Sequence, residues 1–363
     1  MSRNENTVFV LSQYHIDKDH AGYSCLYDLH LQFIEAGARI IELEEIYGKT
    51  DKSLKAFIGT KLSRAYKIDL DPDDIPSGSH LIVLAYTPRF LLALKQLNSQ
   101  FPHFEKIAVY FLDGFDSVNL DGVDRSIMDN IDYVFCAVEE MVEDFKNMGK
   151  KESYFVPFGI DALKYAPLEF EKTIDLLSFG RSNMRYHRDF EQAFNAPESP
   201  FSYLHSTFDT SKLTSQYEHR RLHWKTLLRS KIALCFEPEG IERFCGRSPV
   251  LYRWFECIAA GNLIYGTRPK CEAVETILAW ENSTIEVPKN TSDAVDHIQE
   301  LLSDTQTLES ISKTNRYWAM KLHDWRYRLR DIYELMQTSM PAELARGLDA
   351  TNAAQEKLFS EID

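Results

Sequence analysis

The stretch Ser248–Tyr265, SPVLYRWFECIAAGNLIY, holds a helix start, a helix and an apolar strand in direct succession. Serine is a favoured N-cap residue and proline a favoured first helical residue, so we predict a helix over Ser248–Ala260. Small residues at its end then allow a tight turn into a strand over Asn262–Tyr265. The N–H groups and dipole at the start of such a helix form an anion site. Ser248 and Pro249 are therefore the first candidate ligand-binding residues.

Two charged side chains follow on the same predicted helix. Pro249, Arg253 and Glu256 are spaced four and three residues apart, which places them on one face of an α-helix. An arginine offers a bidentate fork to phosphate oxygens. The helix start and Arg253 together predict a site for an anionic group.

Apolar runs of strand length recur along the whole chain, with helical patterns between them. Because these runs are apolar throughout rather than alternating, they are typical of parallel strands covered by helices on both faces. The predicted strands are Thr7–Leu11, Arg39–Leu43, His80–Ala85, Lys106–Leu112, Asp132–Ala137 and Tyr154–Val156, and then Ile174–Phe179, Phe201–Leu204, Lys231–Phe236, Asn262–Tyr265 and Thr284–Val287. The further predicted helices include Tyr23–Ala36, Thr214–Leu228, Cys271–Trp280, Thr291–Leu302 and Thr305–Met336. We predict an α/β protein of two doubly wound halves, with ligands in the cleft between them.

Several stretches, in this order, resemble glycosyltransferases of the GT-B fold with a family-4-like donor domain. VPFGID at Val156–Asp161, followed by KYAP at Lys164–Pro167, is similar to the linker that ends the N-terminal domain. LLSFGR at Leu176–Arg181 is similar to the strand end that opens the donor domain, and Ser248–Tyr265 is similar to its nucleotide-sugar-binding helix. WAMKLHDWRYR at Trp318–Arg328 resembles the C-terminal helix that crosses back to the N-terminal domain.

The resemblance implies two Rossmann-like domains that face a central cleft. It places an acceptor-side domain over 1–160, a nucleotide-sugar-binding domain over 171–315 and a crossing helix over 316–340. It also implies transfer of a hexose-type sugar from a UDP- or GDP-sugar to a hydroxyl acceptor, with no metal ion and no cofactor. Carbohydrate, lipid-linked, protein and small-molecule acceptors stay open. The alternatives are a nucleotide-sugar epimerase of the same fold and a catalytically inactive binding or scaffold module.

The resemblance carries roles in donor binding to Gly180, Arg181, Arg185, Arg188, Ser248, Pro249, Arg253 and Glu256. Gly180 would let the backbone approach the donor, and Arg181 with either Arg185 or Arg188 would neutralise its diphosphate. Arg253 stands where the family has a phosphate-binding lysine. Glu256 stands where the family has the glutamate that accepts hydrogen bonds from the ribose hydroxyls.

One position departs from the family pattern. Ser248 stands where retaining members carry a second glutamate. Glu237, Glu239 and Glu242 precede it in one loop and are candidates to contact the sugar. Retaining and inverting chemistry therefore both stay open.

Inverting enzymes need a base that takes the proton of the acceptor hydroxyl. Asp113 directly follows the predicted strand KIAVYFL, and the carboxyl end of a parallel strand is where such a group is placed. Asp116 is its neighbour in the same loop. His15 and His20, in the loop after the first strand, are alternative bases, and Gly22 in that loop would admit the acceptor or a phosphate.

Composition excludes several classes of protein. The 363 residues suggest two domains. The net charge of −14 disfavours broad contact with nucleic-acid phosphates. No apolar run approaches the ~20 residues of a membrane helix, and the start lacks a signal-peptide pattern, so we expect a cytoplasmic protein without a transmembrane anchor. No G-x-G-x-x-G follows the first predicted strand, which argues against a nicotinamide dehydrogenase.

Overall fold

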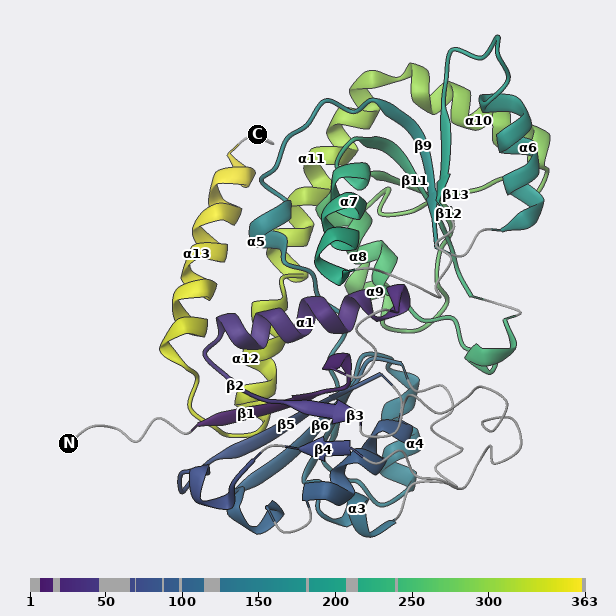
Figure 1. Cartoon of the computed structure of the whole chain (residues 1–363). Helices are drawn as coiled ribbons and strands as arrows, with labels where there is room; N and C mark the ends of the chain where they lie inside the picture. Colours follow the sequence, from purple (N-terminus) through teal and green to yellow (C-terminus); the bar gives the residue numbers. More distant parts are fainter. Residues whose placement is uncertain are drawn as a thin grey trace. The chain divides into compact units, whose positions relative to one another are not determined.

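The computed structural model describes residues 7–15, 20–45, 66–68, 70–86, 88–97, 100–113, 125–180, 183–206, 215–238 and 241–360. The chain divides into two compact units (Figure 1). The first unit holds the described residues of Met1–Lys18, Tyr23–Pro157 and Leu329–Ala345. The second holds those of Asp19–Gly22, Phe158–Arg328 and Arg346–Asp363. None of the described helices is both long and apolar enough to cross a membrane.

The first unit is built on a parallel sheet with the strand order β2-β1-β5-β6-β7-β8. Its strands are nearly all buried, which explains why they read as continuous apolar runs. Their bounds are Val8–Ser12 (β1), Arg39–Ile41 (β2), His80–Ala85 (β5), Lys106–Phe111 (β6), Tyr133–Cys136 (β7) and Ser153–Phe155 (β8). The helices are α1 (Ser24–Glu35), α3 (Arg125–Asp129) and α4 (Glu140–Asn147), with a 3₁₀ segment over Pro88–Leu97. A short antiparallel pair, β3 (Leu43–Glu45) with β4 (Tyr66–Ile68), was not predicted.

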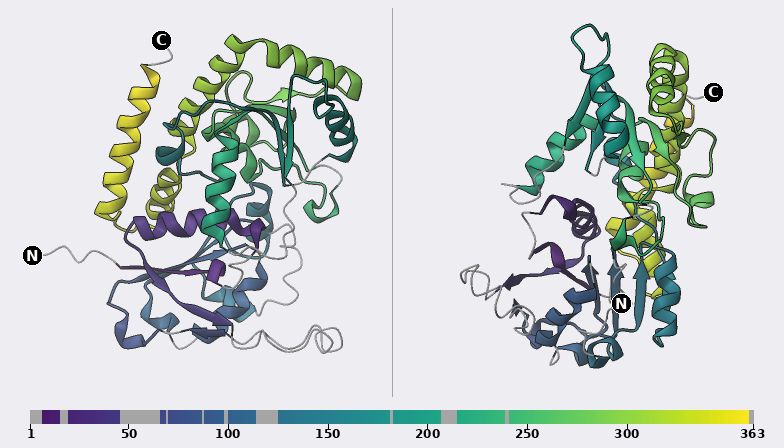
Figure 2. Two further views of the ribbon diagram at one scale, coloured as in Figure 1. Left: turned by 45° about the horizontal axis from the view of Figure 1, so that its top comes forward. Right: turned by 90° about the vertical axis from the view of Figure 1, so that its right-hand side faces the viewer.

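The second unit has a five-stranded parallel sheet with the order β10-β9-β11-β12-β13, and helices lie on both of its faces (Figure 2). The strands are Ile174–Phe179 (β9), Tyr203–Ser206 (β10), Ser230–Phe236 (β11), Leu263–Thr267 (β12) and Ile285–Glu286 (β13). The helices are α5 (Ala162–Tyr165), α6 (Met184–Phe194), α7 (Gln216–Leu227), α8 (Tyr252–Ala259), α9 (Val274–Ile277) and α10 (Thr291–Ser303). Two doubly wound parallel sheets confirm the predicted fold class.

Alternate residues of β11 face different helices. Ile232 and Leu234 belong to an apolar cluster with residues of α6 and α10. Cys235 points to the other face, where its Sγ lies 3.8 Å from Sγ of Cys257 in α8. The sheet therefore positions α8 against β11, with the start of that helix near the carboxyl ends of the strands.

The helix predicted over 316–340 is not continuous. α11 (Thr305–Leu322) ends before His323, and α12 (Trp325–Leu335) begins after Asp324. The break follows from the hydrogen bonds of Asp324, which is fully buried and accepts from the backbone N–H of Leu163 at 3.0 Å and from the backbone N–H of Arg326 at 2.9 Å. A side chain that accepts the backbone N–H two residues further on caps the start of the next helix and competes with continuation of the preceding one.

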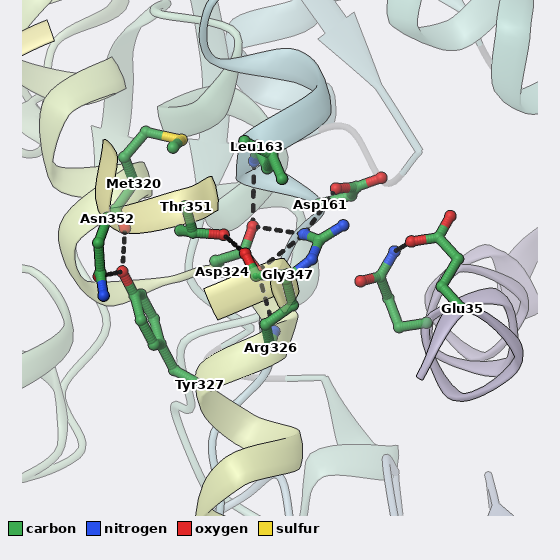
Figure 3. A network of polar contacts seen from close by, with 11 residues as sticks. Glu35, Asp161, Leu163, Met320, Asp324, Arg326, Tyr327, Gly347, Thr351 and Asn352 are labelled. Atoms are coloured by element: carbon green, nitrogen blue, oxygen red, sulfur yellow. Dashed lines mark hydrogen bonds and ion pairs between the residues drawn. The ribbon is translucent and has the colours of Figure 1, made fainter. Parts of the chain in front are cut away.

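The same aspartate is part of a polar network in the second unit (Figure 3). Nη1 of Arg326 donates to Oδ1 of Asp324 and to Oδ1 of Asp161, each at 3.0 Å. A single β-bridge pairs Ile160 with Asp324. These contacts hold Ile160 and Asp161 against the junction of α11 and α12. The tail forms a further helix, α13 (Ala342–Phe359).

Candidate functional site

Two predicted donor-binding residues meet at the carboxyl end of β9. Gly180 directly follows this strand and has a φ of +67°, in the left-handed region that favours glycine. A Cβ atom built on Gly180 would lie 3.1 Å from Nη2 of Arg253, in the first turn of α8. The guanidinium carbon of Arg253 also lies 5.8 Å from the ring centroid of Phe179. The backbone at Gly180 and a cation from another element are thus side by side.

The predicted helix start at Ser248 is wrong. α8 begins at Tyr252, and its N-cap is Leu251, which makes no side-chain capping bond. The hydroxyl of Ser248 is engaged elsewhere, since it donates to Oε2 of Glu237 and accepts from the backbone N–H of Lys270 at 3.1 Å. Pro249 therefore precedes the helix, and Arg253 is the second residue of its first turn.

Glu237 connects the ends of two strands with the segment before α8. It follows β11, its side chain is only 6% exposed, and its Oε1 lies 3.2 Å from Nζ of Lys270. Its backbone N–H donates to Oγ1 of Thr267, the last residue of β12, at 3.0 Å. One of the three predicted sugar-contact glutamates therefore lies at the carboxyl ends of β11 and β12, next to Ser248.

Glu256 is buried and doubly paired. Its Oε1 accepts from Nη1 of Arg220 at 2.6 Å and from Nε2 of His223 at 3.0 Å, and the three side chains are 5–6% exposed. Burial by itself raises the pKa of Glu256, but the charges and hydrogen bonds of His223 and Arg220 outweigh it and lower the pKa to about 2. The carboxylate is therefore ionised at neutral pH, so the imidazole Nε2 donates to it.

Arg220 and His223 were not predicted as site residues. Both lie on α7, and both belong to its buried stripe with Gln216, Trp224 and Leu227. An arginine and a histidine on the buried stripe of a helix are a signal in the sequence, because such groups are buried only with partners. Their partner Glu256 is 36 and 33 residues away along the chain, so the sequence did not identify it.

No described contact joins the other residues predicted to bind the donor or its sugar to Gly180, Arg253 or Glu256. Arg185 and Arg188 are exposed on α6, where the guanidinium carbon of Arg185 lies 5.9 Å from the ring of Tyr186. Glu242 is exposed in a 3₁₀ turn over Glu242–Phe244. Arg181 and Glu239 lie outside the described residues.

The candidate bases lie in different parts of the chain. Asp113 follows β6, as predicted, and its backbone N–H donates to the carbonyl of Tyr86 at 2.9 Å. His15 is almost buried, with Nδ1 3.4 Å from Oε2 of Glu42. Asp116 lies outside the described residues.

His20 and Gly22 belong to the second unit. Nδ1 of His20 accepts the backbone N–H of Gly22 at 3.0 Å, which assigns the proton of a neutral ring to Nε2. A Cβ on Gly22 would lie 2.9 Å from Cε1 of His20, so any side chain at this position would have to displace the His20 ring. Among the described residues, no group of three or more histidine, cysteine, aspartate or glutamate side chains is arranged to hold a metal ion.

Comparison with known proteins places the chain by its fold. No protein-family model matches the sequence, and no curated protein is significantly similar to it. An alpha-glucosyltransferase solved in complex with UDP is similar over 91% of this chain and 99% of its own, with 11% identity and a TM-score of 0.56. The same kind of enzyme with UDP and a 13-mer DNA covers 92% of this chain and 100% of its own, with 10% identity and a TM-score of 0.54. Anabaena HepE in complex with UDP-glucose covers the same shares, also with 10% identity and a TM-score of 0.54. The chain therefore has the GT-B fold that the sequence resemblance implies. It has two α/β units, each built on a parallel sheet.

Proposed function

We propose that this protein is a glycosyltransferase that moves a hexose-type sugar from a UDP- or GDP-sugar to a hydroxyl acceptor. The observation that carries the proposal is the approach of Arg253 to Gly180 at the carboxyl end of β9, with the ionised Glu256 three residues after Arg253 on α8. The similarity in fold to proteins solved with UDP and with UDP-glucose supports it.

The diphosphate of the donor would bind at Gly180 and Arg253. A glycine without a side chain lets phosphate oxygens approach the backbone, and the arginine fork donates to them in a charge-assisted manner. The first turn of α8 adds its dipole. Because negative charge develops on the leaving nucleotide diphosphate during glycosyl transfer, these groups stabilise the transition state. Arg181 and either Arg185 or Arg188 are proposed as further cations of this site.

The hydroxyl groups of the donor would be held by carboxylates. Glu256 is ionised and is proposed to accept from the ribose hydroxyls. Glu237 is proposed to contact the sugar, because, of the two candidates in its loop that the structure describes, it is the one at the strand ends beside Ser248 and Lys270. In this arrangement Ser248 helps to orient Glu237.

Transfer with inversion needs a base for the acceptor hydroxyl. We propose Asp113 for this role, since it lies two residues after the end of the central parallel strand β6; Asp116, His15 and His20 remain alternatives. The anomeric configuration of the product distinguishes this reaction from retaining transfer. We also propose that the reaction needs no metal ion.

Binding and turnover assays test the proposal. UDP or GDP, but not NAD, is expected to raise the melting temperature, because a ligand of the folded state stabilises it by mass action. The nucleotide that stabilises the protein then selects the UDP- or GDP-sugars for assays of hydrolysis and transfer. Conversion of the nucleotide sugar without loss of the nucleotide would instead indicate an epimerase, and binding without any turnover would indicate an inactive module.

The acceptor class is open to a screen of carbohydrates, lipid-linked sugars, proteins and small metabolites. A DNA oligonucleotide belongs in the same screen, because one similar structure contains DNA. We expect DNA to be a poor acceptor, since the net charge of −14 opposes extended contact with phosphates.

A further inference from the structure

We propose that Arg220 and His223 are positioning residues that hold Glu256 by one carboxylate oxygen, so that its other oxygen is presented to the ribose hydroxyls of the donor. The inference rests on the proposed function, because it concerns the nucleotide of the same donor. It adds two residues of α7 to a site that the sequence places on β9 and α8.

The geometry of the carboxylate carries the inference. Both hydrogen bonds to Glu256, from Arg220 at 2.6 Å and from His223 at 3.0 Å, end on Oε1. Within the part of the chain that the structure describes, Oε2 takes no hydrogen bond. A carboxylate has acceptor capacity on both oxygens, so Oε2 can receive a hydroxyl while Oε1 stays anchored.

The anchor itself is held in place from several sides. The guanidinium carbon of Arg220 lies 5.7 Å from the ring of Trp224 and 5.8 Å from the ring of Tyr252. Trp224 in turn stacks on Tyr165, with centroids 3.5 Å apart. Because its surroundings restrict Arg220, the carboxylate it binds has little freedom to rotate.

The trio of Glu256, Arg220 and His223 lies next to the candidate phosphate site at Gly180 and Arg253. The ring of His223 contacts the ring of Phe179 edge-on, with centroids 4.9 Å apart, and Arg253 lies over the same phenylalanine. Phe179 is the residue before Gly180. The groups proposed for phosphate and for ribose are thus connected through one aromatic ring, at a spacing set by β9, α7 and α8.

Stability alone does not account for the trio. Burial of charged groups costs a large desolvation free energy. A protein with well-packed apolar residues in their place is often as stable or more stable. Buried charges that lie beside a candidate ligand site are therefore better explained by a requirement for an ionised and oriented carboxylate.

The test compares two ligands that differ only in the ribose hydroxyls, UDP and 2′,3′-dideoxy-UDP, by titration calorimetry. If GDP is the nucleotide that binds, GDP and its dideoxy form take their place. A hydrogen bond to an ionised group that is lost with the hydroxyls lowers affinity about tenfold to a hundredfold. The wild type is therefore expected to bind UDP at least about tenfold more tightly than the dideoxy form.

In the variant His223→Leu this difference is expected to shrink to less than about threefold, since Glu256 loses one of its two anchors. His223→Gln keeps an N–H donor on the side chain and is expected to restore most of the difference. Arg221→Met is the matched control, because Arg221 is an exposed neighbour on α7 that lies over Tyr217. It should leave the difference unchanged.

Thermal melts establish that each variant is folded. If His223→Leu does not fold, Arg220→Lys replaces it, since this change keeps the charge but moves the donor, and it is also expected to narrow the difference. An unchanged ligand difference in a folded His223→Leu or Arg220→Lys variant would overturn the inference while leaving the proposed function intact. If wild-type protein binds neither UDP nor GDP, the proposed function fails, and this inference fails with it.

Discussion

Gly180 and Arg253 are neighbours in space although β9 and α8 are far apart in the sequence: a Cβ atom on Gly180 would lie 3.1 Å from Nη2 of Arg253. The glycine also has a φ of +67°, which L-residues adopt at a cost. The absence of a side chain at this position therefore serves two needs, the local backbone conformation and the close approach of a cation. Both needs are testable by substitution.

Gly180→Ala is expected to lower the free energy of unfolding by about 1–2 kcal/mol, because a Cβ is unfavourable at this φ. It should also weaken nucleotide binding by about tenfold, because the new methyl group displaces the guanidinium. Gly149→Ala is the control, since Gly149 has a φ of +94° and nothing within 4 Å of its Cβ position. The control should lose stability and keep its affinity for nucleotide. Equal affinities in the two variants would contradict the role of Gly180.

His219 makes stability depend on pH. Burial first, and then the charges of His223 and Arg220, lower the pKa of His219 to about 4 from an ordinary value of 6.5. The unfolded chain therefore takes up a proton before the folded chain does. The stabilisation is fully present above pH 6.5 and is lost as the pH falls from 6.5 toward 4.

Urea denaturation at several pH values measures this effect. His219→Gln should lose less stability than the wild type over that pH interval. Some dependence will remain, because burial and then the charge of Arg328 lower the pKa of the buried His323 to about 3. Substitution of the exposed His103 by Gln is the control and should leave the dependence of stability on pH as in the wild type. Identical plots of unfolding free energy against pH for His219→Gln and the wild type would contradict the assignment to His219.

Asp113→Asn tests the proposed base. If transfer inverts the anomeric centre, kcat should fall by about 10²–10⁴-fold while affinity for the nucleotide stays the same, since the amide cannot take a proton. Asp129→Asn, at an exposed position, is the control. Full turnover by Asp113→Asn would remove Asp113 from the mechanism and direct attention to Asp116, His15 and His20.

Chelation tests whether metal is needed. Turnover should persist in EDTA, because Arg253 and the first turn of α8 are proposed to supply the positive potential for the leaving diphosphate. The carboxylate of Glu237 is already bound to Ser248 and Lys270. Loss of activity in EDTA, with recovery on addition of Mg²⁺ or Mn²⁺, would show that a metal takes part.

The sequence predicts the parallel strands well and the polar contacts poorly. β5 and β9 coincide with the predicted His80–Ala85 and Ile174–Phe179, because a buried parallel strand needs an uninterrupted apolar run. The pair β3–β4 was missed because its strands, LEE and YKI, contain charged residues and so form no apolar run. An element is predicted correctly when the residues of its own segment carry the pattern, and it is missed when they do not.

The start of α8 and the partners of Glu256 show the limit more sharply. Ser248 looks like an N-cap, but its hydroxyl is used by Glu237 and Lys270, which the tertiary fold brings to it. The spacing of Arg253 and Glu256 places both on one face of a helix. Glu256 is nevertheless buried, and it pairs with Arg220 and His223 of α7. Local patterns predict which elements form, whereas partners from distant elements decide what a polar side chain does.

The central claim is that the second unit binds a nucleotide diphosphate through Arg253. Titration calorimetry of UDP and GDP with the wild type and with Arg253→Ala measures it directly. The account predicts that one of the two nucleotides binds the wild type, and that Arg253→Ala binds it about tenfold to a hundredfold more weakly, as expected for the loss of a charge-assisted hydrogen bond. Equal affinity in a folded Arg253→Ala variant would contradict it.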